Sequence, residues 1–181
     1  SESESKSTSV TEKTIEICKD STINFVDEIA QLTELRKLKL QFTMPKFSFL
    51  NGSVNDWLKN RIGLDPKIVF PASLIEVKIS YFNIETLPNL NVGLRTLIFD
   101  HCSFRDNNTA NIVIPDTVEV LEFNECDIKD IPNFPKNLMK LNIDRNNKTN
   151  VQSIIDNLPV GINFLTLNWC DINALDNLPP G

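Results

Sequence analysis

The sequence has few of the residues and motifs on which catalytic and membrane functions depend. Its 181 residues include one histidine, one tyrosine, two tryptophans and five glycines. No stretch approaches the ~20 apolar residues that a membrane-spanning helix needs, so no membrane span is predicted. Neither glycine-rich phosphate-binding pattern, G-x-x-x-x-G-K-[ST] or G-x-G-x-x-G, occurs in the chain. Residues 1–10 are polar, without the apolar region of a signal peptide, and are predicted to be a disordered N-terminal tail.

The single histidine and the spacing of the cysteines argue against an enzyme and against a zinc site. A hydrolase nucleophile needs a base beside it. The only histidine, His101, directly precedes Cys102, and neighbouring residues on a strand point to opposite faces. We therefore expect Cys102 to face inward and His101 to face outward. The remaining cysteines, Cys18, Cys126 and Cys170, form no C-x-x-C pair, so neither a metal nor a cofactor is predicted.

The charge of the chain argues against nucleic acid as its partner. Its formal net charge is −6. A surface that follows a phosphate backbone needs clustered Lys and Arg. Basic residues here are scattered, apart from one local group of Arg36, Lys37 and Lys39.

The chain does contain a repeated pattern of apolar residues. In each copy of the repeat, apolar residues occupy the first, fourth and sixth positions. Six copies occur, at Leu35–Leu38–Leu40, Leu74–Val77–Ile79, Leu94–Leu97–Phe99, Val118–Leu121–Phe123, Leu138–Leu141–Ile143 and Ile162–Leu165–Leu167. A weaker copy, Glu12–Ile15–Ile17, precedes them. Such repeats indicate a solenoid, in which each unit buries its apolar side only by stacking on its neighbours.

The spacing of the copies indicates duplication of a two-repeat block. From Leu74 to Ile162 the first positions advance in steps of 20, 24, 20 and 24 residues, and Pro71, Pro115 and Pro159 lie 44 residues apart. Each of these prolines precedes a first position by three residues, where its fixed φ and missing N–H suit an extended return segment. Units of 20 residues leave little room for a full α-helix, so an irregular or 3-10 outer side is predicted.

The ninth position of the repeat is the sharper signal. It holds Phe82 and then Cys102, Cys126, Asn146 and Cys170, where a small polar side chain can satisfy backbone groups of the turn after the strand. These columns resemble the leucine-rich-repeat consensus L-x-x-L-x-L-x-x-N/C-x-L. Residues 131–143 resemble the short, Pro-containing repeat subtype of bacterial effector ubiquitin ligases. The resemblance covers residues 12–181. It implies an α/β solenoid, a leucine-rich-repeat horseshoe or arc with a concave parallel β-sheet and a mostly irregular or 3-10 convex side.

Two stretches depart from the regular repeat. Residues 21–33 are predicted to form a helical N-terminal region, with Phe25, Ile29 and Leu32 on the face that covers the end of the core. Residues 47–70 are predicted to form an irregular long repeat with a short helix that Ser53 caps and Gly63 ends. Both belong to one leucine-rich-repeat domain over residues 11–181.

The resemblance also implies where a partner would bind, because strand residues between the core positions line the concave face. Exposed aromatic residues and Arg are typical of binding hot spots. The eighth position forms one column, and the third position adds a further aromatic residue, so the predicted partner-binding residues are Phe42, Tyr81, His101, Arg145, Trp169 and Phe164. The alternative is that these aromatic residues pack over the edge of a neighbouring repeat.

These observations predict a non-catalytic, cytoplasmic module that binds another protein. One alternative is the substrate-recognition arm of a ubiquitin ligase, of F-box or effector type, because F-box proteins commonly carry such repeats. Another is a secreted or cell-surface adhesion protein, which a Cys102–Cys126 disulfide or glycans at the Asn51, Asn107 and Asn147 sequons would favour. The sequence leaves the partner's identity and the oligomeric state open.

Overall fold

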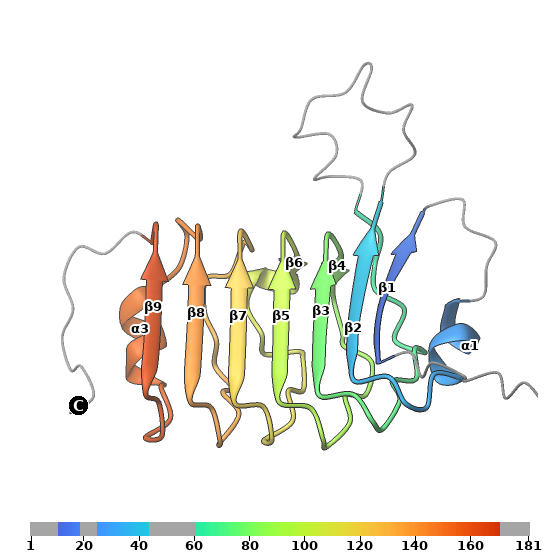
Figure 1. The fold of residues 1–181 in the computed structure, drawn as a ribbon. Coiled ribbons are helices and arrows are strands. Elements are labelled where there is room, and N and C mark those ends of the chain that lie inside the picture. Colours follow the sequence, from blue (N-terminus) through green and yellow to red (C-terminus); the bar gives the residue numbers. More distant parts are fainter. Residues whose placement is uncertain (1–10, 19–24, 44–60, 171–181) are drawn as a thin grey trace, which may run out of the picture.

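Seven parallel strands stand side by side in one sheet, and each turn of the chain adds the next strand (Figure 1). The computed structural model describes residues 11–18, 25–43 and 61–170. The strands run in the order β1 (Glu12–Ile17), β2 (Lys37–Phe42), β3 (Glu76–Ser80), β5 (Thr96–Asp100), β7 (Val120–Asn124), β8 (Lys140–Asp144) and β9 (Phe164–Asn168). The chain is therefore a parallel β-solenoid with little helix.

The apolar residues of the repeat form two continuous ladders inside this solenoid. Successive strands pair in register, so the second apolar residue of each repeat lies beside that of the next, and likewise the third. From β2 to β8 these residues are almost completely buried. The Phe99 and Phe123 rings stack with centroids 5.3 Å apart, and Phe104 packs edge-on against both. Because the ladders run between repeats, the core exists only where repeats stack.

A tight turn precedes each strand of the seven-stranded sheet from β2 to β9, and proline is the first residue of several of these turns. The backbone N–H of Leu74 donates to the carbonyl of Pro71 at 3.1 Å, and that of Val118 donates to Pro115 at 3.0 Å. Leu94 makes the same bond to Asn91. Proline therefore lies where the return segment meets the turn, and its carbonyl accepts the hydrogen bond that closes the turn.

The outer side differs between the two repeat lengths. First strand residues advance by 20 (76 to 96), 24 (96 to 120), 20 (120 to 140) and 24 (140 to 164). The longer units contain the 3-10 helix η2 (Arg105–Asn107) and the α-helix α3 (Val151–Asp156), whereas the shorter ones contain no helix. A second, two-stranded sheet joins β4 (Asn83–Ile84) to β6 (Ser103–Phe104). The four additional residues thus account for the short helices on a mostly irregular side.

The N-terminal repeats refine two predictions. Helix α1 (Phe25–Ala30) lies inside the predicted helical region 21–33, and Ile29 is fully buried. The weak first copy was misaligned by two residues, because Ile15 pairs with Leu40 and Ile17 with Phe42. A shift of two keeps both residues on the core face, so the error was invisible in the pattern. The predicted tail, residues 1–10, and most of the predicted helix in 47–70 lie outside the described residues.

The ninth-position side chains bind backbone carbonyls of two repeats, as predicted. Asn146 Nδ2 donates to the carbonyl of Phe123 at 3.1 Å and to that of Asp144 at 2.8 Å. The Cys102 thiol donates to the corresponding carbonyls of Ile79 and Asp100. Cys102, Asn146 and Cys170 therefore each tie the end of a strand to the strand before it, whereas Phe82 is apolar and Cys126 binds a carbonyl of its own repeat.

We expect Asn146→Ala to lower the free energy of unfolding by about 1–3 kcal/mol, because the two hydrogen bonds from Nδ2 are lost, including the buried one to the carbonyl of Phe123. Asn146→Cys should lose less, since Cys makes the same pair of bonds in other repeats. Urea denaturation followed by circular dichroism measures both. An alanine variant as stable as the parent protein would contradict this role for the ninth column.

Candidate functional site

In the large sheet, a residue with left-handed backbone directly follows each of the strands β3, β5, β7, β8 and β9. These residues are Tyr81, His101, Glu125, Arg145 and Trp169, with φ between 50° and 68°. They occupy the eighth position of their repeats and are called the carboxyl-edge row below. In a continuous strand this position would point into the core, because it lies two residues after a core position. The left-handed residue reverses this alternation and sends the ninth residue inward instead.

Backbone hydrogen bonds fix the row. The N–H of His101 donates to the carbonyl of Asn124 at 2.8 Å, and the N–H of Arg145 donates to that of Asn168 at 2.9 Å. Tyr81 and Glu125 make the equivalent bonds to the next repeat. The backbone position of these four residues is therefore set by the sheet.

Phe42 was wrongly predicted to belong to this surface. It is only 1% exposed, and its ring lies 6.2 Å from that of Phe82. Strand β2 runs straight through Phe42 with no left-handed residue, so regular alternation places this eighth position in the core. The motif alignment gave the right column but could not show which strands end in a left-handed turn.

Histidine and tyrosine contact each other in the middle of the row. The Tyr81 and His101 rings lie 4.8 Å apart at 31°. Both nitrogens of His101 face carboxylates, with Nδ1 2.8 Å from Asp100 Oδ1 and Nε2 3.0 Å from Glu125 Oε2. A neutral imidazole has one N–H, so only a doubly protonated ring can donate to both carboxylates.

Arg145 extends this network toward the end of the sheet. Its Nη1 donates to Glu125, and its Nε lies 3.7 Å from Asp144 Oδ2. The hydrogen bond to Glu125 raises the pKa of Arg145 above its usual value, so the guanidinium stays charged. Among the described residues, Arg145, Asn147 and Trp169 line an open hollow of about 550 Å³. The repeat pattern did not predict these acidic partners, because it shows which residues align between repeats but not which side chains pair.

Two exposed aromatic side chains lie at the two ends of β9, Phe164 at its start and Trp169 directly after it. Trp169 is 81% exposed and Phe164, at the start of β9, is 65% exposed. Phe164 aligns with Lys140 of the neighbouring strand. This end of the exposed face therefore combines two uncovered aromatic residues with two basic ones.

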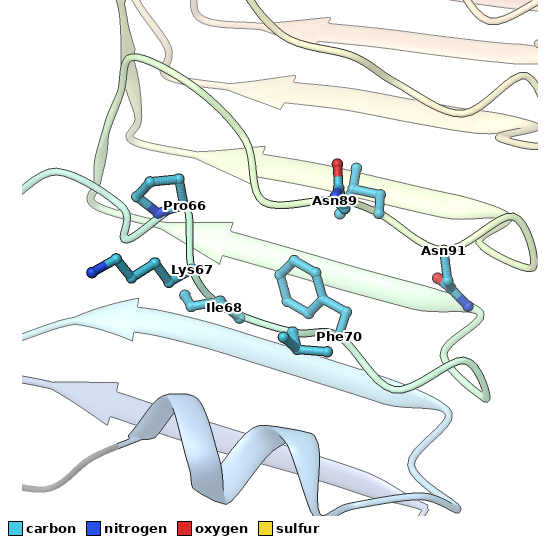
Figure 2. A pocket seen from close by; sticks show the side chains of 8 residues that line it. Pro66, Lys67, Ile68, Phe70, Asn89 and Asn91 are labelled. Atoms are coloured by element: carbon cyan, nitrogen blue, oxygen red, sulfur yellow. The ribbon is translucent and has the colours of Figure 1, made fainter.

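A separate groove lies among the return segments. It has a volume of about 330 Å³ between residues 66–70 and residues 89–91 (Figure 2). Ile68 and Phe70 are largely buried, whereas Val69 is exposed. None of the predicted binding residues lines this groove.

The cysteines are free thiols, and Cys102 lies in the core while His101 remains partly exposed, as predicted. Burial raises the pKa of Cys102 to about 11 and raises that of Cys126 well above its usual value. Among residues 11–18, 25–43 and 61–170, no group of three His, Cys, Asp or Glu side chains could hold a metal ion. In the same ranges no helix has the length and apolar character that crossing a membrane requires.

We expect Cys102 and Cys126 to resist a thiol reagent at about pH 8 in the folded protein, because burial and a raised pKa both suppress the reactive thiolate. Cys170, which is less buried, should react first of these three. Mass spectrometry of tryptic peptides after timed labelling measures the order, and unfolding in urea should abolish it. Rapid labelling of Cys102 in the folded chain would contradict the structure.

Acid should lower the free energy of unfolding by protonating Asp100 at the carboxyl edge of the sheet. Burial alone would raise the pKa of Asp100, but hydrogen bonds from Lys78 and His101 outweigh burial and lower that pKa below 3.8. A lowered folded-state pKa stabilises the protein above the unfolded value, and this contribution is lost as pH falls through the folded-state pKa. We therefore expect the free energy of unfolding to fall between about pH 5 and about pH 2, and to fall less in Asp100→Asn.

Urea titrations at several pH values measure this difference. Glu119→Gln, at an exposed salt bridge with Arg95, controls for the loss of one negative charge. Equal acid sensitivity of Asp100→Asn and the parent protein would show that the Lys78–Asp100–His101 contacts do not stabilise the fold.

Four of the six predicted binding residues come together in the carboxyl-edge row, namely Tyr81, His101, Arg145 and Trp169. Phe164 is exposed at the start of β9, the strand that Trp169 directly follows.

Comparisons of this chain with models of protein families, with curated proteins and with solved structures find no match.

Proposed function

We propose that this chain is a non-catalytic recognition module of the leucine-rich-repeat type that binds another protein through the exposed face of its sheet. The alternation of 20- and 24-residue units and the Asn or Cys at the ninth position support membership of that class. In that class the strand face is the concave side of the arc. The proposed compartment is the cytoplasm, which the free buried thiols support.

The carboxyl-edge row is the observation that carries this proposal. A residue other than Gly held in the left-handed region costs on the order of 1 kcal/mol, and such strain tends to collect at functional sites. None of the five residues in the row is Gly or Asn, which tolerate this conformation best. The row instead presents large side chains, and Tyr, Arg and Trp are the types most common in binding hot spots.

The exposed face also has the rigidity that recognition needs. The first four residues of the row, from Tyr81 to Arg145, are attached to a backbone that the next strand holds by hydrogen bonds. In Figure 1 helix α3 and the return segments lie behind the sheet, α1 lies beside β1 at its edge, and no element of the described ranges covers the front face. A preformed surface loses little conformational entropy when a partner binds.

The charges on this face favour a protein partner over nucleic acid. Lys37, Lys78, Lys140 and Arg145 each pair with a carboxylate of a neighbouring repeat. Basic groups neutralised in this way do not form the continuous positive track that a phosphate backbone requires. The exposed aromatic residues Phe164 and Trp169 then supply most of the available apolar contact area.

Affinity capture from an extract of the source cell tests the proposal. We expect Phe164→Ala/Trp169→Ala to lose at least one protein that the parent chain retains, because both side chains are exposed and contribute little to the core. Quantitative mass spectrometry of the captured proteins measures this loss. Recovery of ubiquitin-ligase subunits would indicate the substrate-recognition arm instead of a free-standing module.

Val92→Ala/Val113→Ala is the matched control. Each of these valines is 82% exposed and lies outside the seven-stranded sheet, so the substitution removes a similar kind of apolar surface elsewhere. Circular dichroism must show that both variants are folded. Identical sets of captured proteins for the parent and the Phe164/Trp169 variant would overturn the proposed binding face.

A further inference from the structure

Four salt bridges across the exposed face share one arrangement, in which the basic group is more exposed than the acidic group. The side-chain exposures are 46% and 28% for Lys37–Glu76, 32% and 20% for Lys78–Asp100, 43% and 19% for Lys140–Glu122, and 61% and 34% for Arg145–Glu125. In these four pairs the basic side chain is the more accessible member, whereas in Lys39–Glu12 the carboxylate is slightly more exposed, at 52% against 47%. Although the whole chain is acidic, a molecule that approaches one of the four pairs therefore meets more of the basic side chain than of the acidic one.

This arrangement coincides with the exposed aromatic residues at one end of the sheet. Lys140 is the register partner of Phe164, and Arg145 is the row neighbour of Trp169. Arg145 and Trp169 also line the open hollow of about 550 Å³, which is large enough for a side chain of a partner. Two outward basic groups thus flank two outward aromatic rings.

We propose that the partner segment that meets this surface is an acidic peptide segment with an aromatic or large aliphatic side chain. Its apolar side chain packs against Trp169, another part of the segment reaches Phe164 at the opposite end of β9, and its carboxylates approach Lys140 and Arg145. This inference rests on the proposed function and adds the chemistry of the partner. Charge complementarity favours it, because a basic segment would meet more of the ammonium and guanidinium groups than of their carboxylate partners.

The charges of Lys140 and Arg145 are expected to contribute modestly to the affinity for the partner, and this contribution should depend on the salt concentration. Glu122 and Glu125 already compete for Lys140 and Arg145, so a partner carboxylate shares these cations with them. Exposed ion pairs are weak and are screened within about 10 Å at 0.1 M salt. Most of the affinity should therefore come from the aromatic residues, whereas the charges select the partner.

Selection from a random peptide library of about twelve residues, displayed on phage and panned on the full chain, tests the inference. Enriched peptides are then synthesised, and their affinities are measured by fluorescence anisotropy at about 0.05 M and about 0.5 M NaCl. We expect peptides rich in Asp and Glu around an aromatic or aliphatic residue, with weaker binding at the higher salt concentration. Trp169→Ala should weaken binding by about tenfold or more.

Lys140→Gln/Arg145→Gln should weaken binding of the same peptides several-fold and reduce its dependence on salt. The matched control is Lys136→Gln, which removes one exposed positive charge from the turn before β8 and should leave binding unchanged. Circular dichroism of each variant checks its fold.

The other outcomes separate the two proposals. Neutral or basic peptides that still need Trp169 would overturn the acidic partner and leave the proposed binding face standing. Peptides that bind Trp169→Ala as well as the parent chain would overturn both. Failure to enrich any peptide would overturn the peptide inference alone, since the capture experiment tests the binding face independently.

Discussion

Stacking of apolar residues between neighbouring repeats is the interaction on which the rest of this structure depends. The Leu97–Leu121–Leu141 and Phe99–Phe123–Ile143 ladders bury side chains that no single repeat could enclose. In-register stacking also decides which residues become neighbours on the opposite face, because each strand residue lies beside its counterpart in the next repeat. The same ladder that holds the core together therefore assembles residues about 20 positions apart into the binding surface, and the surface is as rigid as the core beneath it.

The left-handed residue at the end of each strand couples the core to this surface. It directs the ninth residue inward, where Cys102 or Asn146 binds backbone carbonyls, and leaves the eighth residue facing solvent. Gly would satisfy the backbone at least as well, but it would present no side chain. Contacts within the row, such as those of His101 and Arg145 with Glu125, offset part of the conformational cost. The side chains proposed to bind a partner thus occupy positions at which the backbone conformation alone would favour Gly.

Repetition made most of the fold predictable, and the errors fall where a repeat differs from its neighbours. The parallel strands, the inward Cys102 and the irregular outer side follow from spacing and from the period-two alternation of strands. Phe42 was misplaced because β2 lacks the left-handed turn of the later strands, a property of local φ that residue type does not reveal. The pairing of Glu125 with both His101 and Arg145 was equally unpredictable, since it depends on side-chain rotamers across three repeats.

Internal pairing of the charges also constrains how this face can discriminate between partners. A carboxylate that approaches Arg145 gains little net energy, because Glu125 and Asp144 already hold the guanidinium. A basic group, however, would have to approach a cation that is more exposed than its own partner, and like charges at close range are strongly unfavourable. The pairs therefore exclude unsuitable partners more effectively than they attract suitable ones. Affinity is left to Phe164 and Trp169, whose uncovered rings gain most from losing contact with water.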